Sequence, residues 1–133
     1  MIKIGIDVGS TTAKLVAVDE NDNLLFSKYE RHNAKAKETI LSFLKELLSE
    51  IGDKDISVRI TGSIGMGISE KCSLPFVQEV VAAAKAIQKD YSHVTSMIDI
   101  GGEDAKVVFF KDAEATDLRM NGNCAGGTGA FID

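Results

Sequence analysis

The chain has 133 residues, of which 44% are hydrophobic and 26% are charged, and its net charge is −5. This composition is typical of a globular domain, and the acidic balance argues against a nucleic-acid partner. No apolar run approaches the roughly 20 residues of a membrane span, and Met1 leads directly into a strand pattern. The two cysteines are far apart in the sequence. We therefore expect a cytoplasmic protein without a membrane segment or a disulfide framework.

The chain opens with two strand patterns joined by a hydroxyl-rich turn. Strands are predicted over Ile2–Val8 and Ala13–Val18, with Asp7 at the end of the first and Lys14 near the start of the second. The turn between them offers backbone N–H groups and hydroxyls that could bind an anion, and the carboxylate could hold the water shell of a phosphate-bound Mg²⁺. An ordinary polar hairpin is the alternative interpretation. The turn residues are Gly9, Ser10, Thr11 and Thr12.

A third strand and a helix complete this part of the pattern. The turn cluster Asp19–Asn23 precedes a strand over Leu24–Tyr29, and residues Arg31–Lys37 are predicted to be a polar connection. The following segment has the apolar spacing of an amphipathic helix, and Gly52 is placed to end it. The apolar stripe consists of Ile40, Phe43, Leu44, Leu47, Leu48 and Ile51.

A glycine-rich stretch follows the next predicted strand. That strand covers Ile56–Ile60 and runs into Thr61–Gly67, which we interpret as a loop that could face a ligand, although its spacing is not the dinucleotide fingerprint. A second, alanine-rich helix is predicted over Val77–Lys89. The first module therefore reads β-β-β-α-β-α and is predicted to span residues 1–90.

Three residues of metal-binding type have no partner at metal-binding spacing in this part of the sequence. Cys72 is expected to be a small, partly buried side chain in the loop before the second helix. His32 and His93 are expected to lie on the surface. We assign none of them to a site.

The second module, residues 91–133, repeats the opening pattern. Asp7–Val16 aligns without a gap on Asp99–Val108, with identical Asp, Gly, Ala, Lys and final Val. Such a repeat predicts two related domains that face each other across a polyphosphate. Strands are expected over Thr95–Ile100, Ala105–Phe110 and about Ala115–Met120, followed by a glycine-rich turn that contains Cys124. Because so short a module cannot bury its sheet, we expect the sequence to be truncated.

Several motifs together resemble the activator components of 2-hydroxyacyl-CoA dehydratases and benzoyl-CoA reductases. They are Asp7–Lys14, Asp99–Lys106 and Asn121–Gly129, while Thr61–Gly67 and Pro75–Glu79 are most similar to large multidomain members. The resemblance implies an α/β, ribonuclease H-like fold of the actin, Hsp70 and sugar kinase superfamily, with ATP between two domains.

The resemblance also implies roles for individual residues. Asp7 and Asp99 would organise Mg²⁺, and Glu103 or Asp104 would orient the attacking water. Compact activators have Gln where this chain has Glu103, which leaves that role open. The residues that would hold the phosphates are Gly9, Ser10, Thr11, Thr12 and Lys14 in the first loop and Gly101 and Gly102 in the second.

Cys124 matches the first ligand of the [4Fe–4S] cluster that family activators share across a homodimer. The second ligand and the adenosine-binding part would lie beyond Asp133. ATP hydrolysis in the family drives a low-potential electron into the partner acyl-CoA dehydratase or reductase. Two other classes stay open on the residues alone, a small-molecule kinase of the same superfamily and a non-enzymatic nucleotide switch that binds a protein partner.

Overall fold

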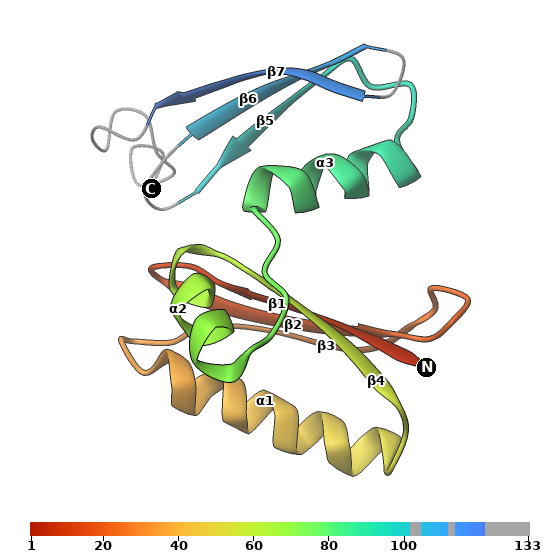
Figure 1. The fold of residues 1–133 in the computed structure, drawn as a ribbon, viewed down its shortest axis with the longest axis vertical. Coiled ribbons are helices and arrows are strands. Elements are labelled where there is room, and N and C mark those ends of the chain that lie inside the picture. The colour runs from red at the N-terminus through yellow and green to blue at the C-terminus, as the bar shows by residue number, and fades with distance from the viewer. Residues whose placement is uncertain (102–104, 112–113, 122–133) are drawn as a thin grey trace. The chain divides into compact units, whose positions relative to one another are not determined.

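The structure is a computed structural model that describes residues 1–101, 105–111 and 114–121 (Figure 1). The chain divides into two compact units, Met1–Gln78 and Glu79–Asp133, and each has its own hydrophobic core. In the part of the chain that the structure describes, no helix is long and apolar enough to cross a membrane.

The first unit is built on a four-stranded mixed sheet with the strand order β3-β2-β1-β4. Strand β1 (Ile2–Val8) pairs antiparallel with β2 (Thr12–Val18) and parallel with β4 (Ile56–Thr61). Strand β3 (Leu24–Arg31) forms the edge beside β2. Alternate residues of β1 are buried, so one face of the sheet is apolar and the other carries polar side chains.

Helix α1 (Ala36–Ile51) covers the apolar face of this sheet (Figure 1). The predicted stripe is confirmed except at Leu48, which is 54% exposed because it lies at the outer edge of the stripe. Gly52 ends the helix with a φ of 69°, and its N–H donates to the carbonyl of Leu48. The buried residues of the core are Ile2, Ile4, Ile6, Val8, Ala13, Leu15, Ala17, Phe26, Ile40, Phe43, Leu47 and Ile60.

Most of the glycine-rich stretch after β4 is helical, so our interpretation of it as a loop is wrong. Helix α2 spans Ser63–Cys72 and packs against β1 and β4. Gly65 in the helix and Gly62 just before it allow this close approach, because a Cβ at Gly65 would lie 3.2 Å from the Ile60 side chain and Gly62 has a φ of +96°. Cys72 is the last residue of α2 and is exposed, which corrects the expectation of a partly buried loop cysteine.

The second unit pairs one helix with a three-stranded antiparallel sheet of order β5-β6-β7. The strands are β5 (Ser96–Ile100), β6 (Ala105–Lys111) and β7 (Glu114–Asn121). Helix α3 (Glu79–Asp90) packs through Ala84 against Val108 and Phe110. We expected this helix in the first module, and its apolar face packs with the second sheet.

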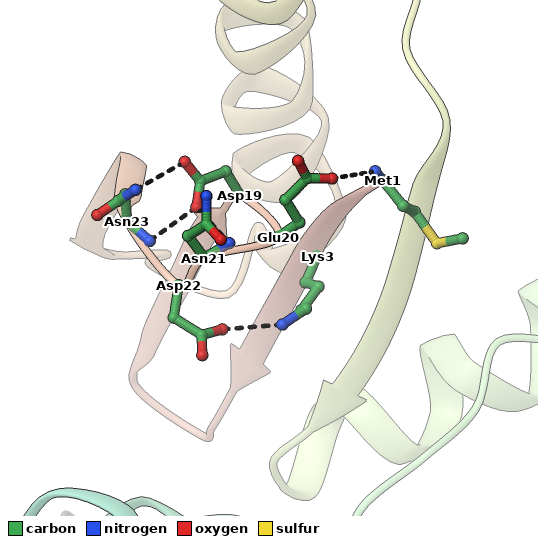
Figure 2. A network of polar contacts seen from close by, with 7 residues as sticks. All are labelled: Met1, Lys3, Asp19, Glu20, Asn21, Asp22 and Asn23. Carbon is green, nitrogen blue, oxygen red and sulfur yellow. Dashed lines mark hydrogen bonds and ion pairs between the residues drawn. The ribbon is translucent and has the colours of Figure 1, made fainter.

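The turn between β2 and β3 is held by a local polar network (Figure 2). Asp19 accepts hydrogen bonds from the backbone N–H groups of Asn21 and Asn23 and from the Asn23 side chain, at 2.8 to 3.0 Å. Lys3 on β1 forms an ion pair of 2.8 Å with Asp22. These bonds close the turn and set where β3 begins.

Candidate functional site

The first hairpin brings an aspartate and a lysine together on the polar face of the sheet. Asp7 on β1 is directly opposite Lys14 on β2, and Lys14 Nζ lies 3.0 Å from Asp7 Oδ2. The side chains are 31% and 41% exposed, so the pair is accessible from solvent. Lys14 Nζ also lies 5.3 Å from the centroid of the Tyr29 ring. The hairpin thus presents one cation and one carboxylate at the mouth of its turn.

The turn itself has the donors that an anion needs. The Gly9 N–H donates to the Thr12 carbonyl at 3.0 Å, which closes the turn. Ser10 and Thr11 are exposed, and their hydroxyl oxygens lie 3.4 Å apart. Among the described residues, no backbone carbonyl accepts from the N–H of Ser10 or Thr11. Exposed N–H groups and hydroxyls beside a lysine form a suitable site for phosphate oxygens.

His32 forms hydrogen bonds to this turn, a role that the sequence did not indicate. We expected a surface histidine, but the residue is only 3% exposed. Its ring Nε2 lies 2.8 Å from the Gly9 carbonyl oxygen, and its backbone N–H donates to the Thr11 carbonyl at 3.2 Å. The burial comes from contacts with residues distant in the sequence, so no local pattern could have indicated it.

Helix α2 begins beside the aspartate of the hairpin. A Cβ at Gly62 would lie 2.2 Å from the Val8 carbonyl oxygen and 2.8 Å from Asp7 Oδ1, so only glycine fits. Thr61 is the parallel neighbour of Asp7, and its buried hydroxyl has no hydrogen-bond partner among the described residues. The residues that lead into α2 therefore pack closely against the backbone next to Asp7.

The second hairpin repeats the first in detail, which confirms the predicted internal repeat. Asp99 on β5 is opposite Lys106 on β6, as Asp7 is opposite Lys14. Every described pair between β5 and β6 has its counterpart between β1 and β2 at the same offset. The ladder to the third strand also shifts at the corresponding place in each unit, between Ala17 and Val18 and between Phe109 and Phe110.

The lysines of the two hairpins differ in their surroundings. Lys106 is buried, and its Nζ donates to Glu79 Oε2 of helix α3 at 3.1 Å. Lys14 is partly exposed and pairs with Asp7 of its own hairpin. Gly101 follows β5 and is half-buried. The other predicted residues of the second loop, Gly102, Glu103 and Asp104, and the predicted cluster ligand Cys124 lie outside the described residues.

The described donors fit one of the two metal groups that the sequence analysis expected. Mg²⁺ bound to a nucleotide needs one or two carboxylates and takes its other ligands from phosphates and water, which Asp7 at the mouth of the turn can satisfy. In the described part of the chain, no group of three or more His, Cys, Asp or Glu residues is placed to hold a metal by itself. Cys72 is the one cysteine described, and it is free and exposed, so these residues do not form a cluster site.

Comparisons of the sequence with known proteins found a matching family and several similar proteins. The sequence model of the BadF/BadG/BcrA/BcrD ATPase family matches residues 4–133. The (R)-2-hydroxyglutaryl-CoA dehydratase activating ATPase of Acidaminococcus fermentans is 26% identical over 132 residues, which are 98% of this chain and 50% of that protein. The chain spans about half the length of the curated relatives that it matches.

Solved structures give the same result for the fold. The component A structure of the A. fermentans dehydratase has a TM-score of 0.83 and 26% identity, with 99% of this chain and 51% of that chain covered. The activator of the 2-hydroxyisocaproyl-CoA dehydratase from Clostridium difficile, solved with bound ADPNP, has a TM-score of 0.83 and 28% identity, with 100% and 50% covered. The expected α/β fold of the actin and Hsp70 type is confirmed.

Proposed function

The chain belongs to the BadF/BadG/BcrA/BcrD ATPase family, and we propose that it supplies the N-terminal portion of an ATP-hydrolysing activator. The observation that carries this proposal is the repeated hairpin, with an Asp–Lys pair in the same register in each unit. Two similar loops of this kind suit a nucleotide whose phosphates are bound from two domains. The activator solved with bound ADPNP supports nucleotide binding by this fold.

The first loop binds the phosphates in this proposal. Lys14 and the N–H groups and hydroxyls of the turn contact phosphate oxygens, while Asp7 orients water on the nucleotide-bound Mg²⁺. The bound Mg·ATP supplies the phosphoryl group and the charge neutralisation that hydrolysis requires. The turn residues that take part are Gly9, Ser10, Thr11 and Thr12.

The second loop approaches the terminal phosphate. Asp99 would help to hold the Mg²⁺. Gly101 and Gly102 would allow the backbone to come close to the terminal phosphate. Hydrolysis needs a water in line with the bond that breaks, and Glu103 or Asp104 orients it.

The similarity to the family supports a proposal for the partner and for the electron carrier. The relatives' names describe activators of acyl-CoA dehydratases, so we propose that the complete protein acts on an acyl-CoA dehydratase or reductase. Cys124 would supply one thiolate to a [4Fe–4S] cluster shared in a homodimer or between duplicated modules, and such a cluster would provide low-potential electron transfer.

The test measures ATP hydrolysis and iron content in the complete protein, prepared without oxygen. We expect hydrolysis, iron and acid-labile sulfide in the wild type, and loss of the iron with retained nucleotide binding in Cys124→Ser. Cys72→Ser is the matched control, because this exposed residue lies on α2, and it should keep its iron.

The outcomes separate the competing functions. Full iron content in Cys124→Ser would contradict the activator. Hydrolysis without iron in the wild type would indicate a nucleotide switch, and phosphorylation of an added small substrate would indicate a kinase.

A further inference from the structure

We propose that His32 is a positioning residue for the phosphate-binding turn, an inference that rests on the proposed function. His32 is not one of the residues expected to contact the nucleotide itself. It binds the carbonyl groups of the turn at both Gly9 and Thr11 and is almost fully buried. Its role is to fix the direction in which the turn presents its N–H groups.

The hydrogen bonds of the ring favour one tautomer of the neutral imidazole. Nδ1 accepts from the backbone N–H of Ala34 at 3.2 Å, so this nitrogen carries a lone pair. In the neutral ring the proton is then on Nε2, which donates to the Gly9 carbonyl at 2.8 Å. Both ring nitrogens are therefore used, and the ring has a single orientation that satisfies them.

A tight turn after β3 holds the ring in place. The Lys35 N–H donates to the His32 carbonyl at 2.7 Å, and the two residues between them, Asn33 and Ala34, have φ values of 49° and 63°. Positive φ at both central positions is typical of a type I′ turn. Because this turn brings the Ala34 N–H to Nδ1, the ring cannot rotate without losing a hydrogen bond.

The planar peptide group transmits this constraint to the expected ligand side. The Gly9 carbonyl and the Ser10 N–H belong to one trans peptide and point in opposite directions. When His32 binds the carbonyl, the Ser10 N–H must point away from His32. Ser10 is exposed, so this N–H is available to a phosphate oxygen. Loss of the ring would let the peptide rotate and misdirect the donor.

Two amide substitutions separate the functions of the two ring nitrogens. In His32→Gln the side-chain NH₂ can reach the position of Nε2 and donate to Gly9, whereas in His32→Asn the shorter amide can replace only Nδ1. We expect the affinity for a Mg²⁺-bound, non-hydrolysable ATP analogue to fall about tenfold in His32→Asn and His32→Ala, because one hydrogen bond is lost. His32→Gln should stay within about threefold of the wild type.

The experiment titrates the complete protein with the analogue and records ¹H–¹⁵N spectra. The Ser10 amide resonance should shift in His32→Ala and His32→Asn and stay near its wild-type position in His32→Gln. Leu47→Ala is the control for stability, because Leu47 is a fully buried residue of helix α1 in the same unit. It should unfold more easily and bind the analogue with wild-type affinity.

The experiment distinguishes a failure of the proposed function from a failure of the inference about His32. If the wild type binds no nucleotide, the proposed function is wrong and the inference falls with it. If the wild type binds and His32→Ala binds equally well with an unchanged Ser10 resonance, the inference alone is wrong. An imidazole ¹⁵N spectrum with the proton on Nδ1 would also overturn it.

Discussion

At the scale of single residues, the Asp7–Lys14 ion pair contributes little to the stability of the fold. Both side chains are about a third exposed or more, and exposed ion pairs contribute only about 0–1 kcal/mol to stability. The lysine can therefore turn toward a phosphate at little cost to the fold. Charge-assisted hydrogen bonds to a bound phosphate are worth roughly 1.5–3 kcal/mol, so in the proposed site Lys14 would favour the phosphate over Asp7.

Lys14→Ala should weaken nucleotide binding or hydrolysis by about ten- to a hundredfold, since it removes this charge-assisted contact. Titration calorimetry with Mg²⁺ and an ATP analogue measures the loss. Lys3→Ala is the control, because Lys3 lies on the same hairpin and pairs with Asp22 at 2.8 Å in an exposed ion pair. Equal affinities for the two variants would show that Lys14 does not contact the phosphates.

The sequence pointed to Asp7 and Lys14 of the first hairpin as candidate site residues, but it did not point to His32. Asp7 and Lys14 could be found because they recur with the same spacing in a second copy. His32 has no such copy, and its burial depends on how β3 returns beside the turn. Contacts of this kind are set by tertiary packing, which a local pattern does not contain.

At the scale of elements, helix α2 forms where its sequence argues against a helix. Glycine costs roughly 1 kcal/mol relative to alanine inside a helix, and the predicted loop from Thr61 to Gly67 contains three of them. Packing of Gly65 against Ile60, and the close approach at Gly62, offset this cost. The strands and α1 were predictable because period-2 and period-3.6 patterns agree with their burial.

Gly62, just before helix α2, and Gly67, within it, should differ sharply in their tolerance of alanine. Gly62→Ala is expected to destabilise the protein by about 2–5 kcal/mol, because it adds a left-handed backbone penalty to a clash with Val8. Gly67→Ala meets no atom within 4 Å and should stabilise by about 0.5–1 kcal/mol. Urea unfolding measures both changes. A similar effect of the two substitutions would contradict the packing of α2 against β1.

The β2–β3 turn should make stability depend on pH in the acid range (Figure 2). Hydrogen bonds from the Asn23 side chain and then its backbone N–H lower the pKa of Asp19 below its ordinary value. A carboxyl with a lowered pKa in the folded state stabilises the protein above its unfolded pKa, and this contribution is lost as the pH falls through the folded pKa.

Asp19→Ala should therefore unfold more easily than the wild type at neutral pH. The difference should disappear in acid, below the lowered pKa of Asp19. Thermal unfolding across this pH range measures it. Asn21→Ala keeps the backbone N–H that bonds Asp19, so it should change little. A difference that persists unchanged in strong acid would show that the carboxylate does not stabilise the turn.

At the scale of the whole molecule, the internal repeat is the feature that sequence and structure share most fully. The alignment of Asp7–Val16 on Asp99–Val108 predicted a second hairpin, and the register of β5 with β6 confirms it. The sheet on which α3 packs was harder to predict, because an alanine-rich helix can pack on either sheet. In the structure, Ala84 of α3 packs with Val108 and Phe110 of the second sheet.

The central claim is that the two hairpins serve one nucleotide, and a double-mutant cycle tests it most directly. Asp7→Asn, Asp99→Asn and the double variant are compared in the complete protein for affinity toward the Mg²⁺-bound ATP analogue. The exposed Asp53→Asn serves as control and should bind as the wild type does. If both carboxylates act on one Mg²⁺, each single variant should weaken binding, and the double variant should lose less than the sum, with a coupling of about 1 kcal/mol or more. Additivity within about 0.5 kcal/mol would contradict a shared site.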